Sequence, residues 1–369
     1  MKKLSVTVVA GIGCAMAPSV FAQSSVTLYG IVDVGISYAS NVGGHAQAQE
    51  QSGIFNGNRF GFKGQEDLGG GLSAVFQLED GFSANNGTFG QGTTGTTGAM
   101  ATAAVTRLFG RQAWVGIKSP WATVTLGRQY DFMYDLAPIA ASNYATSYMH
   151  RPGTANALLG NNGSTTDFDR IGGARVDNSV KLSSASLGGF SLGGIYGFGG
   201  QAGAFSNGST QGAGVKYAQG NLQVAAAWTN LKEADASSSY RVYGGGARYQ
   251  LGPVRLAAVY TNAEWTARGD RVDTVEFGAQ YLITPAFSLA AAYYYSKPNN
   301  EAKNVILKGT RNQVGAVADY AFSKATDVYL ACDYQRAKHG YAAQIYSLSP
   351  TDAATNHQSV IAVGVQHYF

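Results

Sequence analysis

The residues whose types and spacing could do chemistry are few, and each set lacks a part that its chemistry requires. GFSLG, residues 189–193, has the G-x-S-x-G spacing of a nucleophile elbow, which needs a strained turn between a strand and a helix. Ser191 instead belongs to a short-turn hairpin, so a nucleophilic role is not expected. GQGTTG, residues 90–95, has the spacing of a phosphate-binding loop, but no helix follows it.

The metal-binding side chains are just as dispersed. The five histidines fall in connections and in the last strand without metal-ligand spacing, and they are His45, His150, His339, His357 and His367. Cys332 is the one cysteine outside the leader, so it has no internal disulfide partner. We therefore expect no catalytic residue, no metal and no cofactor. An alternative from another class is an outer-membrane hydrolase that uses a barrel as scaffold, but it needs a constellation that these residues do not offer.

Charged residues at every second position are the remaining candidates. They occur in NRFGFKGQED, residues 58–67, in LSAVFQLE, residues 72–79, and in RVDNSVKL, residues 175–182. If the apolar positions face outward, the other face collects Arg59, Lys63, Gln65, Gln77, Glu79, Arg175, Asp177, Ser179 and Lys181. These side chains would set the local field inside a water-filled channel.

The elements that position these residues are strands. In VTLYGIVDVGISY, residues 26–38, apolar and polar side chains alternate with the period of two that predicts a two-faced strand. One face carries Val26, Leu28, Val32, Val34, Ile36 and Tyr38. The same pattern recurs to the closing VIAVGVQHYF, residues 360–369. We expect this last strand to pair with the first one, so that Ile361, Val363 and Val365 join the same outward band.

Composition excludes several classes of protein. Only 13% of the residues are charged, 49 of 369 are glycine and 12% are aromatic, whereas ordinary soluble domains carry about 25% charged residues and about 7% glycine. The apolar content argues against disorder, and no run after the leader reaches the ~18 apolar residues of a spanning helix. A net charge of +4 gives no polyelectrolyte patch, so no nucleic-acid partner is expected.

Together these patterns predict an all-β fold, a transmembrane β-barrel of about 16 antiparallel strands, with short periplasmic turns and long external loops. A sheet in hydrocarbon must close, because each unpaired backbone group there costs several kcal/mol. Tyr293, Tyr295, Tyr334 and Phe369 would lie in its interfacial girdles. Residues 1–22 read as a cleaved signal peptide, with Lys2 and Lys3 before an apolar stretch, which leaves 23–369 as the barrel domain.

One long stretch without alternation, residues 129–173, is expected to fold into the lumen and narrow it, because loops of this length in compact folds are usually functional. It contains Asp131, Asp135, Arg151, Asp167, Asp169 and Arg170. Its carboxylates would face basic wall residues, namely Arg59, Lys63, Arg111, Arg128 and Arg175. The alternative is an external loop whose charges are solvated.

The chain also resembles a known family. SSVTLYGIVDVGI, NRFGFKGQEDLGGGLSAVFQLEDGF, RQAWVGIK, TVTLGRQYD, RVDNSVKL, ADYAFSKATDVYL and VGVQHYF occur in order over essentially the whole chain. They are similar to the Gram-negative general porins of the β-proteobacterial type. The resemblance implies a homotrimeric 16-stranded barrel in the outer membrane, an inward-folded third loop, and passive diffusion of ions and small hydrophilic solutes.

The resemblance also implies partners and residue roles. Arg59, Lys63, Arg111, Arg128 and Arg175 would lie near the constriction, and Asp131 and Asp135 would begin the constricting loop. Asp177 and Lys181, which alternation already assigns to the inner face, complete the expected pore lining. The expected partners are outer-membrane lipid with lipopolysaccharide and the barrel-assembly machinery, which would read terminal Phe369. The basic excess favours anions. A plugged barrel that acts as an adhesin through its loops is the other open alternative.

Overall fold

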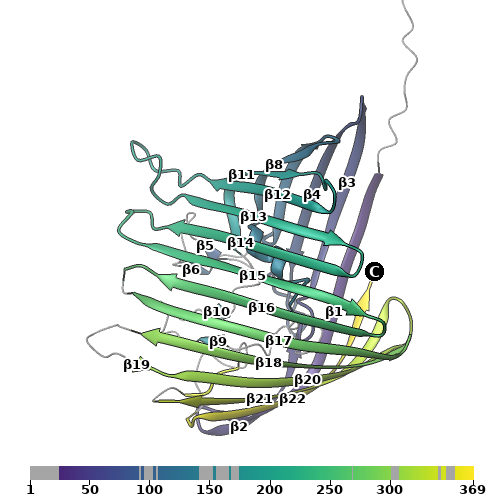
Figure 1. Cartoon of the computed structure of the whole chain (residues 1–369), viewed down its shortest axis with the longest axis vertical. Coiled ribbons are helices and arrows are strands. Elements are labelled where there is room, and N and C mark those ends of the chain that lie inside the picture. The colour runs from purple at the N-terminus through teal and green to yellow at the C-terminus, as the bar shows by residue number, and fades with distance from the viewer. Residues whose placement is uncertain are drawn as a thin grey trace, which may run out of the picture.

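The structure is a computed structural model in which one large antiparallel sheet dominates (Figure 1). It describes residues 25–90, 93–94, 103–104, 107–140, 153–154, 166–167, 174–267, 269–300, 307–339, 342–345 and 354–369. The segment assigned to the signal peptide, and most of the stretch 141–173, lie outside the described residues. No helix among the described residues is long and apolar enough to cross a membrane.

Sixteen strands of this sheet form a closed antiparallel barrel, as the alternating sequence pattern predicts. They are β1 (Ser25–Val42), β3 (Arg59–Gly69), β4 (Leu72–Gly81), β7 (Gln112–Lys118), β8 (Ala122–Tyr130), β11 (Arg175–Ser184), β12 (Phe190–Gly197), β13 (Thr210–Gln219), β14 (Leu222–Lys232), β15 (Ser239–Leu251), β16 (Val254–Trp265), β17 (Asp270–Thr284), β18 (Phe287–Asn300), β20 (Thr310–Ala321), β21 (Thr326–Lys338) and β22 (His357–Tyr368). Closure comes from β1 and β22, which pair from Ile31↔Tyr368 to Ala39↔Val360.

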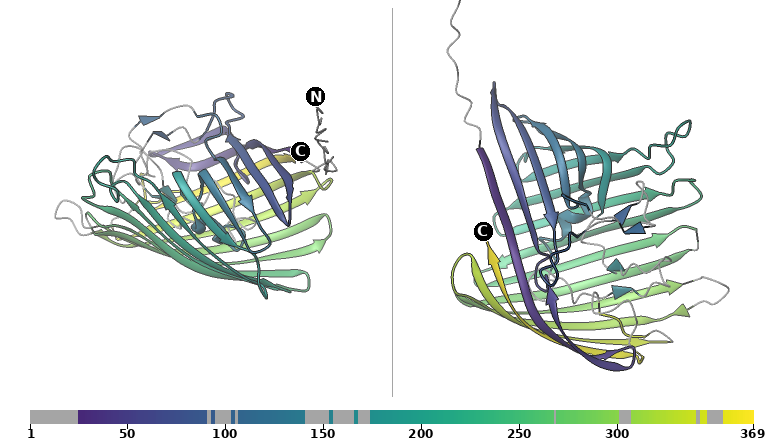
Figure 2. Two further views of the ribbon diagram at one scale, coloured as in Figure 1. Left: turned by 90° about the horizontal axis from the view of Figure 1, so that it is seen from above. Right: turned by 180° about the vertical axis from the view of Figure 1, so that it is seen from behind.

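The remaining elements are short. Strands β2 (His45–Ser52) and β19 (Leu307–Lys308) extend the large sheet at its rim, while β5 (Thr93–Thr94) pairs with β6 (Ala103–Ala104) and β9 (Gly153–Thr154) with β10 (Thr166–Asp167). One 3-10 helix, η1 (Phe132–Leu136), follows β8. Both views of Figure 2 place η1 inside the barrel.

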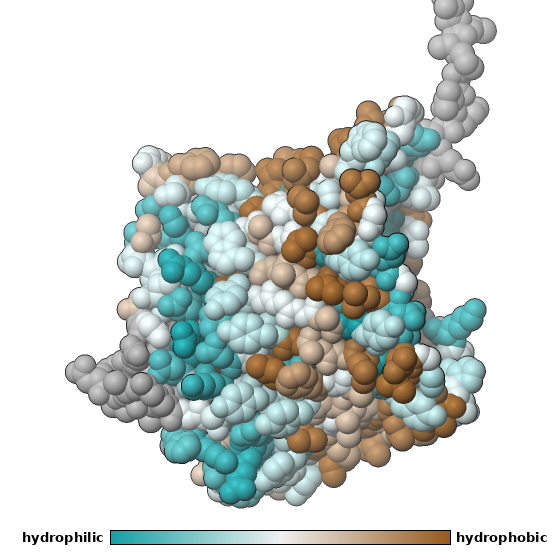
Figure 3. Space-filling model, in the orientation of Figure 1, coloured by the Kyte–Doolittle hydropathy of each residue, from teal (hydrophilic) through white to brown (hydrophobic). Residues whose placement is uncertain are grey.

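The outer face carries the apolar band that the alternation predicts. On β1, Val26 and Leu28 are 66% and 55% exposed, and on β22 Ile361 and Val363 are 51% and 55% exposed. Such exposure suits a hydrocarbon solvent and not water. Figure 3 shows apolar side chains gathered across the middle of β13 to β18, with polar ones at the end that carries the longer connections.

The two ends of the barrel differ as expected from the turn residues. Strands β13 and β14 are joined by residues 220–221, β15 and β16 by 252–253, and β17 and β18 by 285–286. At the first two of these turns, Gly220 and Gly252 have φ angles of +58° and +56°. Glycine adopts this left-handed conformation without strain.

Buried apolar side chains do not form one central core. They form separate clusters where an inward-folded segment lies against the wall. The largest cluster joins η1 to the wall from β11 to β16. A second one joins residues 53–58 to β20, β21 and β22. The inward-folded segments therefore fill part of the lumen. Side chains of the wall alone cannot fill a barrel of this width.

Candidate functional site

The described part of the stretch 129–173 folds into the barrel, in the position that its sequence predicted. Helix η1 contacts β12, β13, β14 and β15. Its Phe132, Met133 and Leu136 are no more than 5% exposed and share a cluster with Ala225, Ala227 and other wall residues. Burial of these apolar side chains holds the segment in place.

The wall beneath η1 is a floor of small residues. Gly193, Gly214, Ala227 and Gly244 are directly opposite one another on four successive strands. A Cβ at Gly214 would lie 2.6 Å from Cβ of Phe132, and one at Gly244 would lie 3.2 Å from Cδ1 of Leu136. The glycines in these strands therefore make room for η1, in addition to permitting twist.

The two aspartates that begin this segment have different environments. Asp131 is 2% exposed, and its carboxylate accepts hydrogen bonds from the backbone N–H of Ala174 at 3.0 Å and the hydroxyl of Thr229 at 2.7 Å. Because its backbone N–H also bonds to the Ala174 carbonyl at 2.9 Å, Asp131 pins the base of the segment to the wall. It is buried where this segment packs on the wall.

Asp135 is half-buried beside two lysines of the wall. Burial raises the pKa of Asp135 above the ordinary aspartate value, and the charges of Lys181 and Lys216 act in the opposite direction. The ammonium of Lys181 donates to the Tyr130 carbonyl at 2.9 Å and lies 4.3 Å from the ring centre of Phe132. The basic wall residues whose charges act on Asp135 are therefore Lys181 of β11 and Lys216 of β13.

A cluster of basic and aromatic side chains lies around Glu79 and Tyr130. The Nε of Arg111 donates to Glu79 at 2.7 Å, and the hydroxyl of Tyr29 donates to the other oxygen of Glu79 at 2.9 Å. The guanidinium of Arg175 donates to the hydroxyl of Tyr130 at 2.9 Å. Lys63 lies 5.2 Å from the ring centre of Tyr29, a cation–π distance.

Tyrosine rings connect this cluster to η1. Tyr130 stacks on Tyr134 of η1 with ring centres 4.0 Å apart. Arg111 and Arg175 lie 5.9 Å and 4.9 Å from the ring centre of Tyr130. The positions of Arg111, Arg175 and η1 are therefore coupled through one pair of rings.

Arg128 and Asp177 lie next to each other where β8 and β11 pair. Arg128 pairs in register with Ala113 of β7. Asp177 precedes Asn178, whose φ of +48° marks a bulge in β11 opposite Arg128. Simple alternation could not foresee this bulge, which moves Asp177 off the row of Ser179.

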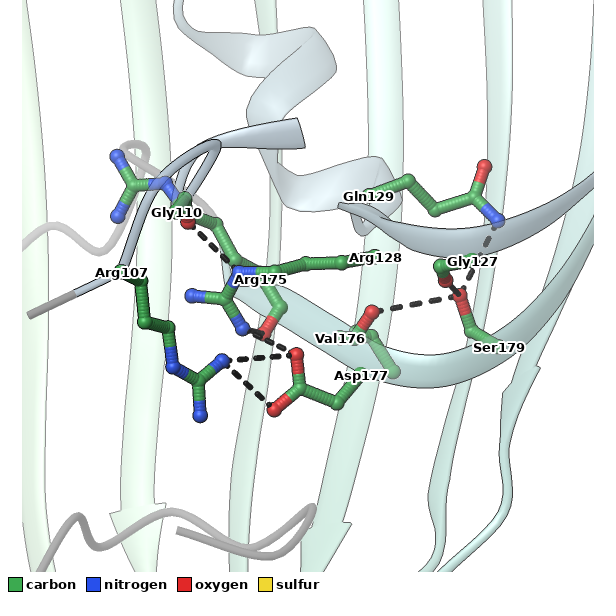
Figure 4. Close-up of polar contacts among 9 residues, drawn as sticks. All are labelled: Arg107, Gly110, Gly127, Arg128, Gln129, Arg175, Val176, Asp177 and Ser179. Carbon is green, nitrogen blue, oxygen red and sulfur yellow. Dashed lines mark hydrogen bonds and ion pairs between the residues drawn. The ribbon is translucent and has the colours of Figure 1, made fainter. Parts of the chain in front are cut away.

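These two residues form an ion-pair group with the end of the preceding connection. Arg128 binds Asp177, Arg107 lies 3.1 Å from the same carboxylate, and Nε of Arg128 donates to the Gly110 carbonyl at 2.7 Å. In Figure 4 the side chains of Arg107 and Arg128 point toward Asp177, whereas that of Arg175 points away from it. The group ties residues 107–110 to β8 and β11.

The connection between β21 and β22 adds another inward segment. Ile345 is 1% exposed and packs against Ala39 and Val360. The side-chain amide of Gln335 donates to the Gln344 carbonyl at 2.8 Å and accepts from the Gln344 N–H at 2.6 Å. Residues 342–345 are thereby fastened along the inner face of the barrel at the end of the long connections.

Sequence reasoning missed several residues of this region. Lys216 lies between Val215 and Tyr217 on β13, so the period of two could have assigned it to the inner face. Glu79 was assigned to that face, but its pairing with Arg111 needed the register of β4 and β7. Arg151, Asp169 and Arg170 lie outside the described residues, and the side chain of Asp167 is not described either.

The formal catalytic motifs do not assemble. Ser191 lies within β12, opposite Lys216, and not on a strand-to-helix turn. GQGTTG lies partly outside the described residues. Across the ranges that the structure describes, no three His, Cys, Asp or Glu side chains gather in a way that could hold a metal ion.

The chain end is docked on the first strand. The N–H of Gly30 donates to the Phe369 carbonyl at 2.9 Å, and the N–H of Phe369 donates to the Gly30 carbonyl at 3.1 Å. The Phe369 ring occupies the space that a Cβ at Gly30 would need. The terminal residue thus extends the β1–β22 ladder by one position.

Comparison with known sequences gives a consistent family. The profile of the family described as Gram-negative porin matches residues 5–340. An outer membrane porin protein of Bordetella pertussis is 34% identical over 192 residues, 48% of this chain and 43% of that protein. Outer membrane porin protein 32 of Delftia acidovorans is 29% identical over 201 residues, 54% of this chain and 50% of that protein. The matches thus span half or less of these curated relatives.

Solved structures share the fold over nearly the whole chain. An anion-selective porin from Comamonas acidovorans has a TM-score of 0.76 at 22% identity, covering 94% of this chain and all of that one. OmpF of Salmonella typhi, in complex with daunomycin, has a TM-score of 0.64 at 20% identity, covering 93% of this chain and 97% of that one. At these identities the likeness concerns the fold.

Proposed function

This chain belongs to the Gram-negative porin family, and on that premise we propose that it is an outer-membrane diffusion channel for ions and small hydrophilic solutes. The observation that carries the proposal is a closed barrel whose outer face is apolar and whose inner face is polar and charged. Inward-folded segments narrow the lumen from its wall. Ions and small solutes diffuse through such a water-filled path, and the local electric field of its charged walls selects among the ions.

The charges next to η1 support a preference for anions. The proposed pore lining comprises Arg59, Lys63, Arg111, Arg175 and Lys181, with Asp135 on the opposing segment. Glu79 neutralises Arg111 in part, because the two side chains form an ion pair at 2.7 Å. The structural neighbour titled an anion-selective porin supports the same direction. The proposed lining also includes Arg128 and Asp177, whose side chains bind each other.

The proposed partners follow from the outer surface and the chain end. We include a homotrimer, outer-membrane lipid with lipopolysaccharide, and the barrel-assembly machinery. Exposed Val115 and Leu126, at 58% and 52%, are apolar surface that lipid or another subunit can cover. Export through a cleaved signal peptide, residues 1–22, remains part of the proposal.

Planar-bilayer recording on the purified protein tests the channel function. We expect large stepwise ohmic currents and, in a salt gradient, a reversal potential with the sign for anions. Absence of currents from correctly folded protein would sink the proposal. A liposome-swelling assay with small sugars separates the channel from an adhesin with a plugged lumen, which would leave the liposomes unswollen.

Terminal Phe369 provides a separate test of assembly. Removing it deletes the two backbone hydrogen bonds to Gly30 and the ring that covers this glycine. We expect the amount of folded protein in the outer membrane to fall while the conductance of inserted molecules stays unchanged. The matched control is a Tyr368→Phe variant, which keeps the terminal residue.

A further inference from the structure

The second strand of the barrel is interrupted by residues that the ladder does not need. Ser52 of β2 lies opposite Val34, and Arg59 of β3 lies opposite Ile31. An unbroken antiparallel ladder would place two residues between them, opposite Asp33 and Val32. The chain has six there, residues 53–58, so four are surplus. We call this six-residue segment the lobe.

The lobe turns into the lumen. Ile54 is completely buried and clusters with Val317, Tyr329, Ala331 and Ala362, and the ring of Phe55 stacks on Tyr329 at 5.1 Å. These wall residues are on the inner face, since Leu330 and Val363, which alternate with them, are 45% and 55% exposed on the outer one. A Cβ at Gly35 would lie 2.8 Å from Cδ1 of Ile54, so glycine makes room for the lobe here too.

A buried carboxylate holds the lobe in shape. Asp33 is 0% exposed, and one of its oxygens accepts the backbone N–H groups of Phe55 at 2.8 Å and Asn56 at 2.6 Å. Its other oxygen accepts the hydroxyl of Tyr329 at 2.6 Å. The backbone N–H of Asp33 in turn donates to the side chain of Asn58. Charge-assisted bonds of this kind are stronger than neutral ones and fix the turn geometrically.

The lobe ends at the basic cluster. Arg59 follows it directly, and the point where a Cβ of Gly57 would lie is 3.6 Å from Nη1 of Arg111. Arg111 contacts Tyr130, which stacks on Tyr134 of η1. A continuous series of contacts therefore runs from the lobe through Arg111 and the tyrosine pair to η1. The pore is bounded at this level by the lobe on one side and by η1 on the other.

We propose that the lobe, residues 53–58, is a second selectivity-determining constriction segment, and that Asp33 is the positioning residue that holds it and thereby fixes Arg59 and the buried Arg111 beside the path of the permeating anion. This inference rests on the proposed channel function and goes beyond it, because it assigns selectivity to a segment outside the third loop. The substrate class that it concerns is small anions.

Deleting the four surplus residues, Ile54 to Gly57, tests the proposal directly. Gly53 and Asn58 then fill the two ladder positions opposite Asp33 and Val32, and Arg59 keeps its register. We expect single-channel conductance to rise about twofold, because the segment that obstructs the lumen is removed. We also expect the anion-to-cation permeability ratio to fall about twofold, because Arg111 loses the segment that lies against it. The matched control is a four-residue deletion of 234–237 in the exposed β14–β15 connection, expected to leave both quantities unchanged.

The outcomes are separable. Wild-type protein without currents overturns the channel function itself. A deletion variant that inserts and retains wild-type conductance and selectivity overturns the role of the lobe. If the deletion variant does not fold, Asp33→Asn decides: it keeps the side-chain size and removes the charge that the lobe N–H groups bind. A shift of its reversal potential in the same direction supports the proposal, and an unchanged reversal potential overturns it.

Discussion

Two segments fold inward from opposite parts of the barrel wall, and they combine apolar packing and hydrogen bonds to a buried aspartate in different proportions. Helix η1 lies on β12 to β15 through apolar side chains that pack on a floor of glycine and alanine. The lobe lies on β20, β21, β22 and β1, where a buried carboxylate binds its backbone. Apolar packing is non-directional and tolerates small shifts, whereas a charge-assisted network fixes one geometry.

The difference matches what each segment contributes to the pore. Helix η1 carries Asp135, whose environment is set by two lysines at the ends of long side chains. The lobe adjoins Arg59 and Arg111, and Arg111 is fixed by Glu79 and by the ring of Tyr130. The rigid side of the constriction thus carries the arginines, and the side held by packing carries the carboxylate.

The largest effect is expected from breaking the apolar anchor of η1. Phe132→Ala leaves a cavity over Gly193 and Gly214 and should cost about 3–5 kcal/mol of the free energy of unfolding. Urea unfolding of protein folded into vesicles measures this loss. Phe205→Ala is the control, because that ring is 70% exposed in an outer connection. Equal losses in both variants would contradict apolar anchoring.

The next effect concerns the ion pair on the lobe side. Glu79→Gln keeps a hydrogen-bond acceptor for Arg111 but removes the countercharge, which should cost about 2 kcal/mol. It should also raise the anion-to-cation permeability ratio about twofold, because the guanidinium field is no longer neutralised. Reversal potentials in a salt gradient measure the ratio. Glu66→Gln, at an exposed position of β3, should leave it unchanged.

A smaller effect is expected from one hydroxyl of the lobe network. Tyr329→Phe keeps the stacking on Phe55 and removes the donor to Asp33, which should cost about 1 kcal/mol of the free energy of unfolding. Thermal melting of the folded barrel checks this. Tyr334→Phe on the outer face is the matched control, and a melting temperature as low as that of Tyr329→Phe would argue against a specific role for the buried network.

The smallest effect is a pH dependence carried by η1. Because burial raises the pKa of Asp135, its carboxylate takes up a proton at a pH above the ordinary aspartate range as the solution is acidified. Loss of this negative charge should increase anion preference as pH falls. Asp135→Asn should remove that pH dependence from the reversal potential, while Asp235→Asn in an outer connection should keep it. Identical pH profiles for wild type and Asp135→Asn would refute the assignment.

Individual residues show how much of the structure the sequence predicts. The period of two correctly placed Val26 and Ile361 on the outer face and predicted that the last strand closes on the first. It also placed the start of the stretch 129–173 inside the barrel. It does not foresee the bulge at Asn178, which moves Asp177 off the row of Ser179. It does not predict that Asp131 accepts hydrogen bonds from Ala174 and Thr229, which come from later in the chain.

The sequence by itself determined that this chain forms an amphipathic closed barrel, because alternation is a local property that each strand carries. The tertiary structure alone decided how the lumen is narrowed. The hydroxyl that binds Asp33 belongs to Tyr329, 296 residues away, and the glycines beneath η1 face Phe132 only once the register of four strands is set. Contacts of this kind depend on barrel closure, which brings distant strands together and which no local pattern encodes.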